Sequence, residues 1–422
     1  MKRIDRKRYL DRLISRKSNG MIKVITGVRR SGKTFLLFNL FKDHLLQSGV
    51  NEDHIISIAL DSKENESMRN PENLYREIID RTGNDGEYYV ILDEIQMTDD
   101  FESVMNSLLH RDNLDVYITG SNSKFLSSDI ITEFRGRGDE IMVRPLSFSE
   151  FVSAYDGSAM DALNEYMDYG GLPELLSFRN DEQKASYLKS IMETTYLLDI
   201  KERNVIRLPQ VLDNLVDVLS SSVGSMVNTR KIRDTMLTAG NRSVDDDTLS
   251  KYLGYLEDAF IFEKAERYDV KGRKYITSTK KYYSVDQGLT NARLNFRQIM
   301  DRPHIMENII FNELRSRGYD VDVGEVRYSK VKDNSSIVIR SEVDFIARKG
   351  SRQYYIQSVY RMDDDAKYEQ ESRPLLKIND MFRKIIITGD EIKSHFDDNG
   401  IMHLGLIEFL MDPDSLEHDS RL

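Results

Sequence analysis

Eight consecutive residues near the N-terminus have the types and the spacing needed to bind phosphate. They are Gly27-Val28-Arg29-Arg30-Ser31-Gly32-Lys33-Thr34, that is, glycine, four residues, then glycine-lysine-threonine. The glycines let the backbone curl so that its N–H groups point at phosphate oxygens, and the start of the following helix adds a partial positive charge. We expect Lys33 to reach the β- and γ-phosphates and the Thr34 hydroxyl to ligate Mg²⁺. The sequence therefore predicts a nucleotide site made by residues 27–34 with Phe35.

A pair of acids lies about sixty residues later. The apolar run Tyr88-Tyr89-Val90-Ile91-Leu92 ends in Asp93 and Glu94. Such a run is typical of a parallel strand buried on both faces. Two carboxylates at the end of such a strand need a functional explanation, because burying unpaired charge is costly. In an ATPase the reason is available, because Asp93 can hold Mg²⁺ through water and Glu94 can act as the general base on the attacking water.

Two further groups of residues complete the predicted catalytic set. The run Thr119-Gly120-Ser121-Asn122-Ser123 follows a strand, and one of Thr119, Ser121 or Asn122 is expected to sense the γ-phosphate, although a simple polar turn also fits. Asn122 is the residue assigned to the catalytic set. Arg137, preferred to Arg135, is expected to reach the phosphate from the same or a neighbouring subunit. The full set is Lys33, Asp93, Glu94, Asn122 and Arg137.

The elements that position these residues read as an α/β domain over residues 1–145. Apolar strands are expected at residues 21–26, 54–60, 88–92, 115–118 and 140–144. Crossover helices are expected between them. A five-stranded parallel sheet with the acids on a strand other than the first is typical of the additional-strand class of P-loop ATPases. The basic residues 1–20 are expected to form a helix packed beside the nucleotide pocket.

Composition limits the class of protein. The chain has 422 residues, 40% hydrophobic and 31% charged, which is enough for two to four globular domains. No apolar stretch is long enough to span a membrane, cysteine is absent, and no histidines fall at metal-ligand spacing. We expect a cytoplasmic protein. The net charge of −11 argues against unspecific coating by nucleic acid but leaves room for local basic patches.

Read together, these motifs resemble the prokaryotic AAA-like P-loop ATPase family that carries a C-terminal domain called DUF4143. The resemblance covers about residues 20–360. It rests on the phosphate loop, 92–96, 117–123, Gly136-Arg137, 145–148, 169–173, Asp199-Ile200 with Arg203, and 281–289. It implies the fold, ATP and Mg²⁺, but it does not imply a cellular role.

Residues 146–206 are expected to form a helical lid or linker. Helices are expected at 148–155, 159–169 and 182–198, with a turn at Gly170-Gly171 and Pro173. Arg203 either touches the nucleotide or forms an ion pair with Asp199.

Residues 207–289 are expected to form a winged helix, with three helices followed by a hairpin. Residues 263–281 carry seven basic and three acidic side chains, a local reversal that favours contact with double-stranded DNA. A protein partner is the alternative, because the third helix carries Asp245, Asp246, Asp247 and Glu257, which would repel DNA.

Residues 290–410 are expected to form a PD-(D/E)xK nuclease-like domain, to which the DUF4143 name is attached. Glu307, Asp344 and Gln357 fit its first three positions, where carboxylates hold Mg²⁺, but Val359 stands at the lysine position. We therefore expect a nuclease fold that has lost efficient cleavage. The acidic tail 411–422 is expected to fray.

The sequence thus predicts a Mg-ATP-dependent AAA-like ATPase whose nucleotide state orients the two later domains. One alternative is a nucleotide-gated binding switch with little turnover, and another is an ATP-dependent DNA nuclease with a rearranged lysine. An oligomer is possible, with Arg137 or Arg135 acting on a neighbouring subunit.

Overall fold

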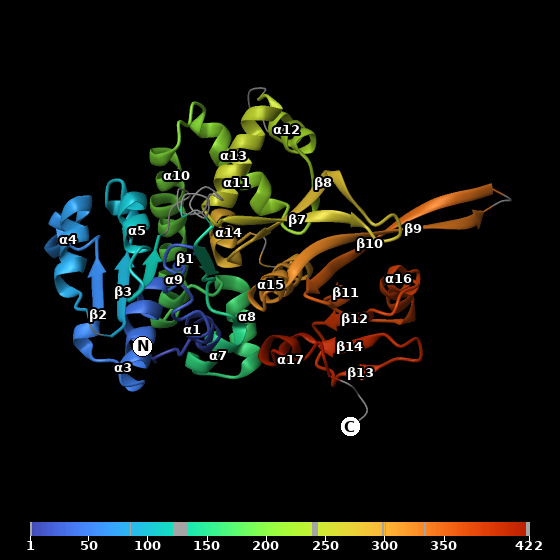
Figure 1. Ribbon diagram of the computed structural model, residues 1–422. Coiled ribbons are helices and arrows are strands. Elements are labelled where there is room, and N and C mark those ends of the chain that lie inside the picture. Colours follow the sequence, from blue (N-terminus) through green and yellow to red (C-terminus); the bar gives the residue numbers. More distant parts are fainter. Residues whose placement is uncertain are drawn as a thin grey trace. The chain divides into compact units, whose positions relative to one another are not determined.

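Figure 1 shows a computed structural model of the chain, which describes residues 2–84, 86–120, 134, 136–238, 244–297, 299, 301–332 and 335–418. The description does not include the side chains of residues 203, 330–332 and 335. The chain divides into two compact units. The first contains Met1–Pro145 with Leu172–Glu174 and Asp258–Phe260, and the second contains Leu146–Gly171, Leu175–Glu257 and Ile261–Leu422.

The first unit is built on a parallel sheet. Within the described residues, five strands pair in the order β2-β3-β4-β1-β5, and every neighbouring pair is parallel. They are β1 (Ile22–Thr26), β2 (Ile55–Ala59), β3 (Tyr88–Asp93), β4 (Leu114–Thr119) and β5 (Gly138–Met142). The predicted five-stranded parallel sheet is confirmed. Strand β4 lies between β1, which precedes the phosphate loop, and β3, which ends in Asp93.

Helices cover both faces of this sheet. One face packs against α1 (Lys7–Ile14) and the helix formed by α2 (Lys33–Phe35), η1 (Leu36–Phe41) and α3 (Lys42–Gln47). The other face packs against α4 (Pro71–Arg81) and α5 (Phe101–Leu108). Short 3-10 turns are η2 (Glu52–His54), η3 (Lys63–Arg69) and η4 (Ile95–Met97). Val24 and Ile25 of β1 point into opposite cores, so this strand is buried on both faces of the sheet.

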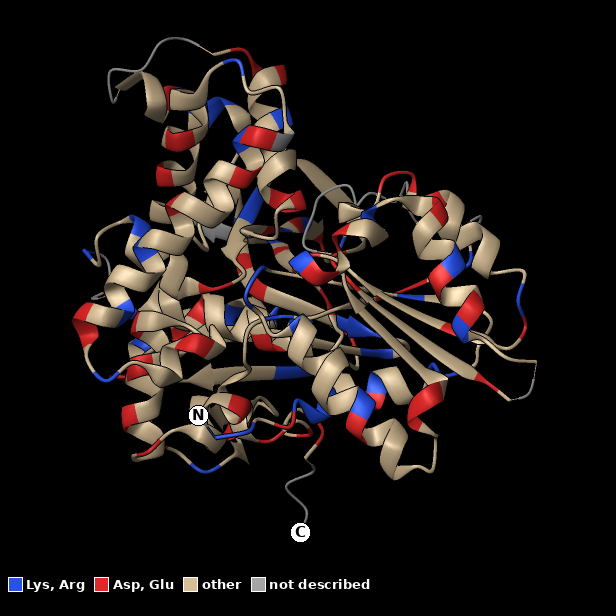
Figure 2. Cartoon of the chain, turned by 90° about the vertical axis from the view of Figure 1, so that its left-hand side faces the viewer, with Lys and Arg blue, Asp and Glu red and all other residues tan. Residues whose placement is uncertain are grey.

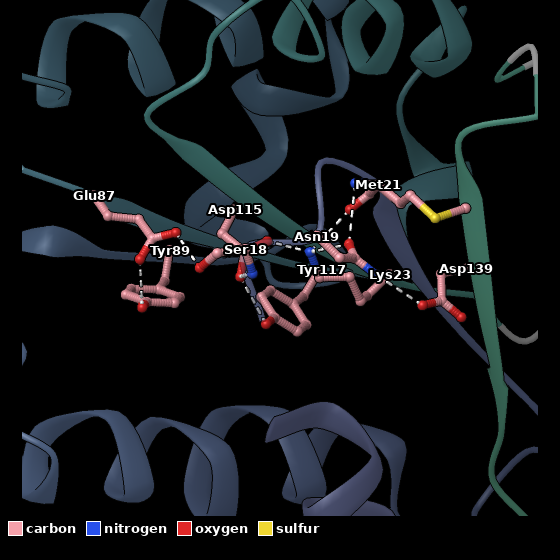
Figure 3. A network of polar contacts seen from close by, with 9 residues as sticks. All are labelled: Ser18, Asn19, Met21, Lys23, Glu87, Tyr89, Asp115, Tyr117 and Asp139. Carbon is pink, nitrogen blue, oxygen red and sulfur yellow. Dashed lines mark hydrogen bonds and ion pairs between the residues drawn. The ribbon is translucent and has the colours of Figure 1, made fainter. Parts of the chain in front are cut away.

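A polar network lies at the amino ends of β1 and β4, the ends of these strands opposite the phosphate loop (Figure 3). Lys23 of β1 and Asp115 of β4 are buried and form an ion pair. Asp115 Oδ2 also accepts hydrogen bonds from the Tyr117 hydroxyl at 2.8 Å and from the Ser18 N–H at 3.1 Å. Lys23 Nζ donates to Asn19 Oδ1 at 3.2 Å and also to a backbone carbonyl. The network therefore ties the segment that joins α1 to β1 to the middle of the sheet.

The second unit opens with helices. They are α7 (Phe148–Ala154), α8 (Ala159–Tyr169), α9 (Asp181–Ile191), η7 (Met192–Leu197) and α10 (Leu198–Arg203). The short turn η6 (Pro173–Ser177) has its first two residues in the first unit and its other three in the second. Ser147 begins α7 with a reciprocal capping box, because its hydroxyl accepts from the Glu150 N–H and the Glu150 carboxylate accepts from the Ser147 N–H. The three helices predicted in this region are confirmed.

Three helices and three strands follow. They are α11 (Pro209–Ser221), β6 (Met226–Val227), α12 (Thr229–Thr238), α13 (Asp246–Asp258), β7 (Phe262–Asp269) and β8 (Lys274–Ser284). β8 pairs antiparallel with both β6 and β7. The predicted hairpin is therefore present, with a short strand beside it that the sequence pattern did not reveal.

The last part of the chain is a mixed α/β structure. Its elements are α14 (Gln287–Arg293), α15 (Arg302–Ser316), β9 (Asp320–Lys332), β10 (Ser335–Lys349), β11 (Arg352–Val359), α16 (Asp365–Leu376), β12 (Arg383–Thr388), β13 (His395–Phe396), β14 (Met402–Gly405) and α17 (Leu406–Met411). In the described part of the chain, nine strands form one sheet in the order β13-β14-β12-β11-β10-β9-β7-β8-β6. The β7–β8 hairpin thus continues into the C-terminal sheet through the parallel pair β7–β9.

Two sequence motifs meet inside the second unit. The Gly171 N–H donates to Asp286 Oδ2 at 2.8 Å, and Asp286 also caps α14. A Cβ at Gly170, whose φ is 81°, would lie 2.1 Å from the Asp286 carboxylate, so only glycine fits there. Gln287 and Asn291 donate to carbonyls at the end of α8. The predicted turn at 170–173 therefore joins α8 to α14.

The tail is packed where it is described. The Arg317 guanidinium donates to the Pro413 carbonyl at 2.9 Å and to the Ser415 hydroxyl at 3.2 Å, and Leu416 is buried. The prediction of fraying was wrong for these residues, because an arginine in the turn after α15 satisfies their polar groups. Among the described residues, no helix has the length and apolar character needed to cross a membrane.

Candidate functional site

The phosphate-binding loop connects β1 to α2. Gly27 has a φ of 126°, and a Cβ there would lie 2.1 Å from the Val143 carbonyl oxygen, so this glycine lets the loop pass close to the end of β5. Gly32 has a φ of 90° and precedes the first helical residue. Both positions need the left-handed backbone that glycine adopts without strain. The loop lies at the carboxyl end of β1, the edge where open α/β sheets bind ligands.

Lys33 is held inside the loop. Its ammonium donates to the carbonyl oxygens of Gly27 at 2.9 Å and Val28 at 3.0 Å. Burial lowers the pKa of Lys33 to about 8, although the nearby carboxylates of Glu94 and Asp93 act in the opposite direction. The Lys33 ammonium therefore lies beside the backbone that would bind phosphate, and it loses its proton more readily than an exposed lysine does.

Thr34 and Asp93 meet in the same place. The Thr34 hydroxyl donates a 2.7 Å hydrogen bond to Asp93 Oδ2, and the Thr119 hydroxyl donates to Asp93 Oδ1. Burial raises the pKa of Asp93 above its ordinary value, while these two hydrogen bonds lower it. A hydroxyl and a carboxylate are oxygen ligands that suit Mg²⁺, which keeps water and phosphate in its remaining positions. Thr34 and Asp93 therefore fit a Mg²⁺ site completed by a nucleotide.

Glu94 follows in a turn. It has a φ of 53°, and its N–H donates to the Thr119 hydroxyl at 3.0 Å. Its carboxylate accepts a hydrogen bond from the Gln96 amide. The Thr119 hydroxyl thus contacts both acids of the pair. It binds the side chain of Asp93 and the backbone N–H of Glu94. The sequence pattern named Thr119 only as one of three candidates.

Arg6 is a contributor that the sequence pattern missed. Its guanidinium donates to the Ser31 carbonyl in the phosphate loop at 3.0 Å and to the Arg144 carbonyl at 2.7 Å, and the residue is buried. The signal was present in the basic residues 1–20, which were expected beside the pocket. That expectation is confirmed, because Tyr9 and Leu13 of α1 share a core with the helix after the loop.

Several other residues were predicted to belong to this site. Asn122 and Arg135 lie outside the described residues, as does the side chain of Arg203. Arg137 is exposed and immediately precedes β5, where its carbonyl accepts from the Ile22 N–H at the start of β1. The phosphate loop follows the other end of β1, about 15 Å away at 3.3 Å per residue. Arg137 is therefore remote from the loop of its own chain, and its action on a neighbouring subunit stays a prediction.

The second predicted cluster does come together. Glu307 of α15 and Asp344 of β10 both lie beside the Lys281 ammonium of β8, a residue that the sequence analysis did not assign to this cluster. Gln357 of β11 instead donates to Glu371 Oε2 at 3.1 Å. Val359 is buried in an apolar cluster, as an aliphatic residue at the lysine position would be.

The charge pattern of the β7–β8 hairpin is more balanced than its sequence suggested. Four of its basic side chains contact carboxylates, namely Lys264 with Glu257, Arg267 with Glu325, Lys280 with Glu266 and Lys281 with Glu307. Lys271, Arg273 and Lys274 are exposed at its tip. Figure 2 shows basic and acidic residues interspersed along most of the chain. Any DNA contact by this hairpin would therefore rest on its tip.

Comparison with known proteins supports the nucleotide site. A family profile described as an AAA domain matches residues 19–152, and one described as a domain of unknown function, DUF8612, matches residues 160–299. The second match covers the region expected to hold the lid and the winged helix. The DUF4143 assignment for residues 290–410 stays a prediction.

The proteins similar to this chain include two relatives that match most of its length and a solved structure. An uncharacterized protein of Haemophilus influenzae is 35% identical over 92% of this chain and 93% of its own. The uncharacterized protein MJ1544 of Methanocaldococcus jannaschii is 29% identical over 88% of this chain and 82% of its own. A Walker-type ATPase of Pyrococcus abyssi aligns at 15% identity over 69% of this chain and 95% of that chain, with a TM-score of 0.47.

Proposed function

This chain belongs to the family of the Haemophilus influenzae protein and carries an AAA domain, and from that premise we propose that it is a Mg-ATP-dependent ATPase. One observation carries the proposal. The Thr34 hydroxyl of the phosphate loop is hydrogen-bonded to Asp93 at the end of β3, with β4 lying between β3 and β1. That strand order supports the additional-strand class of P-loop ATPases.

Each residue of the site has a separate role in hydrolysis. The backbone of residues 27–34 and Lys33 bind and orient the β- and γ-phosphates. Thr34 and Asp93 hold Mg²⁺, which neutralises the charge of the phosphates. Glu94 accepts the proton of the water whose oxygen bonds to the γ-phosphorus, while the bond from that phosphorus to the bridging oxygen breaks and ADP leaves. Thr119 keeps the Asp93 carboxylate and the Glu94 backbone in place.

Replacing Glu94 by Gln tests this assignment. The variant should bind ATP with nearly unchanged affinity but lose at least about 100-fold in turnover, because it removes the base and leaves the phosphate contacts. Glu77→Gln on the exposed surface of α4 is the matched control and should keep wild-type turnover. Unchanged hydrolysis by Glu94→Gln would sink the assignment. Equally slow turnover by all three proteins, with tight ATP binding, would favour the nucleotide-gated switch.

We also propose that residues 207–289 form a winged helix. The order α11-β6-α12-α13-β7-β8, with β8 paired to both β6 and β7, supports this fold. Because four of the seven basic side chains in residues 263–281 contact acids, contact with a protein is the favoured use. DNA binding at the tip would show as salt-dependent affinity that is lost when Lys271, Arg273 and Lys274 are replaced by Gln.

The C-terminal part supports a PD-(D/E)xK nuclease-like fold. The order α15-β9-β10-β11-α16-β12 places Glu307 on the first helix, Asp344 on the second strand and Gln357 on the third. We propose that this part serves in binding or scaffolding and that nucleotide state controls it. Cleavage of DNA in the presence of ATP and Mg²⁺, abolished by Asp344→Ala, would instead support the nuclease alternative.

A further inference from the structure

Three carboxylates from two elements of the second unit converge on one lysine. Lys281 Nζ of β8 lies 2.8 Å from Glu307 Oε1 of α15, 2.6 Å from Glu342 Oε1 and 3.9 Å from Asp344 Oδ1, both of β10. The Lys281 side chain is 4% exposed. The Tyr283 hydroxyl, two residues along β8, donates to the same Glu307 oxygen at 2.7 Å. Strand β8 therefore provides both of the side chains that donate to Glu307 Oε1.

The centre coincides with the position where a nuclease of this fold holds a divalent metal, but its donor atoms do not fit a metal. Glu307 Oε1 already accepts two hydrogen bonds, and Asp344 Oδ2 accepts one from the Ser358 N–H at 2.8 Å. Gln357 offers only a neutral amide, whose N–H is directed at Glu371. Across the described residues, no group of three or more acidic, histidine or cysteine side chains is arranged to hold a metal.

An ammonium satisfies the electrostatic need of the centre. Carboxylates taken out of water are costly unless a cation accompanies them. Burial alone would lower the pKa of Lys281, but Glu307, Asp344 and Glu342 outweigh it and raise that pKa above its ordinary value, so the lysine stays charged. Burial and the neighbouring Glu307 raise the pKa of Asp344, whereas Lys281 acts in the opposite direction.

We propose that the Lys281 ammonium is the resident cation of the Glu307–Glu342–Asp344 centre and stands in the place of a divalent metal. The centre then fastens the β7–β8 hairpin to α15 and β10 and does not cleave nucleic acid. The lysine is supplied by the hairpin, so the residue that occupies the metal position also attaches the hairpin. The inference rests on the nuclease-like fold proposed above and is independent of the ATPase site.

Binding of Mn²⁺ to the full-length protein without nucleotide tests the proposal, measured by electron paramagnetic resonance and titration calorimetry. Wild type and Asp344→Asn should bind Mn²⁺ identically, because Asp344 holds no metal in either. Lys281→Met should gain about one Mn²⁺ per chain, since removing the ammonium frees the carboxylates. The double variant Lys281→Met/Asp344→Asn should lose that gain, and Lys281→Arg should show none.

Two results would overturn the proposal. One is a wild-type Mn²⁺ site that disappears in Asp344→Asn, since this would place a metal where the ammonium is assigned. The other is a folded Lys281→Met that binds no additional Mn²⁺. If Lys281→Met fails to fold by circular dichroism, the comparison of wild type with Asp344→Asn still decides. Because no ATP is present, failure of this proposal leaves the ATPase assignment standing.

Discussion

The guanidinium of Arg6 donates a 3.0 Å hydrogen bond to the carbonyl oxygen of Ser31, so a residue before the first helix braces the middle of the phosphate-binding loop. The same side chain holds the Arg144 carbonyl just after β5. One buried cation therefore links the loop to the segment that follows β5. Its shape depends on a segment that the phosphate-loop motif does not include.

Arg6→Gln should weaken both the loop and the fold. Two buried carbonyls lose a charged donor, which costs about 1–3 kcal/mol of unfolding free energy. ATP affinity should fall several-fold, because the loop N–H groups are less well organised. Urea unfolding and equilibrium ATP binding measure the two effects. Arg3→Gln is the matched control, since Arg3 pairs with Asp43 at the surface and should change stability by less than about 0.5 kcal/mol. Equal effects of the two variants would contradict a role for Arg6.

Thr119→Val should slow hydrolysis more than it weakens ATP binding. The hydroxyl supports Asp93 by donating to it and supports the Glu94 backbone by accepting from it. Loss of such a supporting group costs about 10–100-fold in activity or metal affinity. We expect turnover to fall in that range and the Mg²⁺ concentration for half-maximal activity to rise. Thr119→Ser keeps the hydroxyl and should remain near wild type. If Thr119→Ser and Thr119→Val have the same turnover and the same dependence on Mg²⁺, the Thr119 hydroxyl does not support the two acids.

The sequence predicted most of the nucleotide site because its motifs are local. Lys33 and Thr34 are set by the spacing inside one loop, and the apolar run before Asp93 identifies a buried strand without knowledge of its neighbours. Arg137 shows the limit of that approach. Its distance from the loop depends on the strand order and on the pairing of β5 with β1, which no local pattern contains.

Long-range pairing also explains what was missed in the second unit. Lys281 is 26 residues from Glu307, and its role appears only when β8 is placed beside α15. The sequence separated a winged helix from a nuclease-like domain, whereas the β7–β9 pair puts their strands in one sheet. Gly170 and Asp286 both lie in motifs recognised in the sequence, but the contact between them is known only from the fold.

ATP affinity should depend on pH through Lys33. Burial lowers the pKa of its ammonium to about 8 in the free protein, and bound phosphates favour the protonated form. Affinity should therefore be level below pH 8 and fall by up to about tenfold per pH unit above it, until the pKa of the bound state is reached. Binding titrations between about pH 7.5 and 9.5 measure this. Lys33→Arg, whose guanidinium stays charged, should bind with no such decline. A wild-type profile as flat as that of Lys33→Arg would refute the lowered pKa.

At the amino ends of β1 and β4, Lys23→Met alone should be more destabilising than replacement of both Lys23 and Asp115. It leaves the buried Asp115 carboxylate with the Tyr117 hydroxyl and the Ser18 N–H but without its cation. Removing one partner of a buried ion pair costs about 3–5 kcal/mol, whereas replacing both partners by apolar groups costs far less. The double variant Lys23→Met/Asp115→Leu should therefore recover part of the loss, and about 1–3 kcal/mol should remain because the Tyr117 hydroxyl and the Ser18 N–H are left without an acceptor. Urea unfolding of the wild type, both single variants and the double variant measures the coupling. A loss below about 1 kcal/mol for Lys23→Met would place the pair with solvent-screened surface ion pairs, contrary to its complete burial.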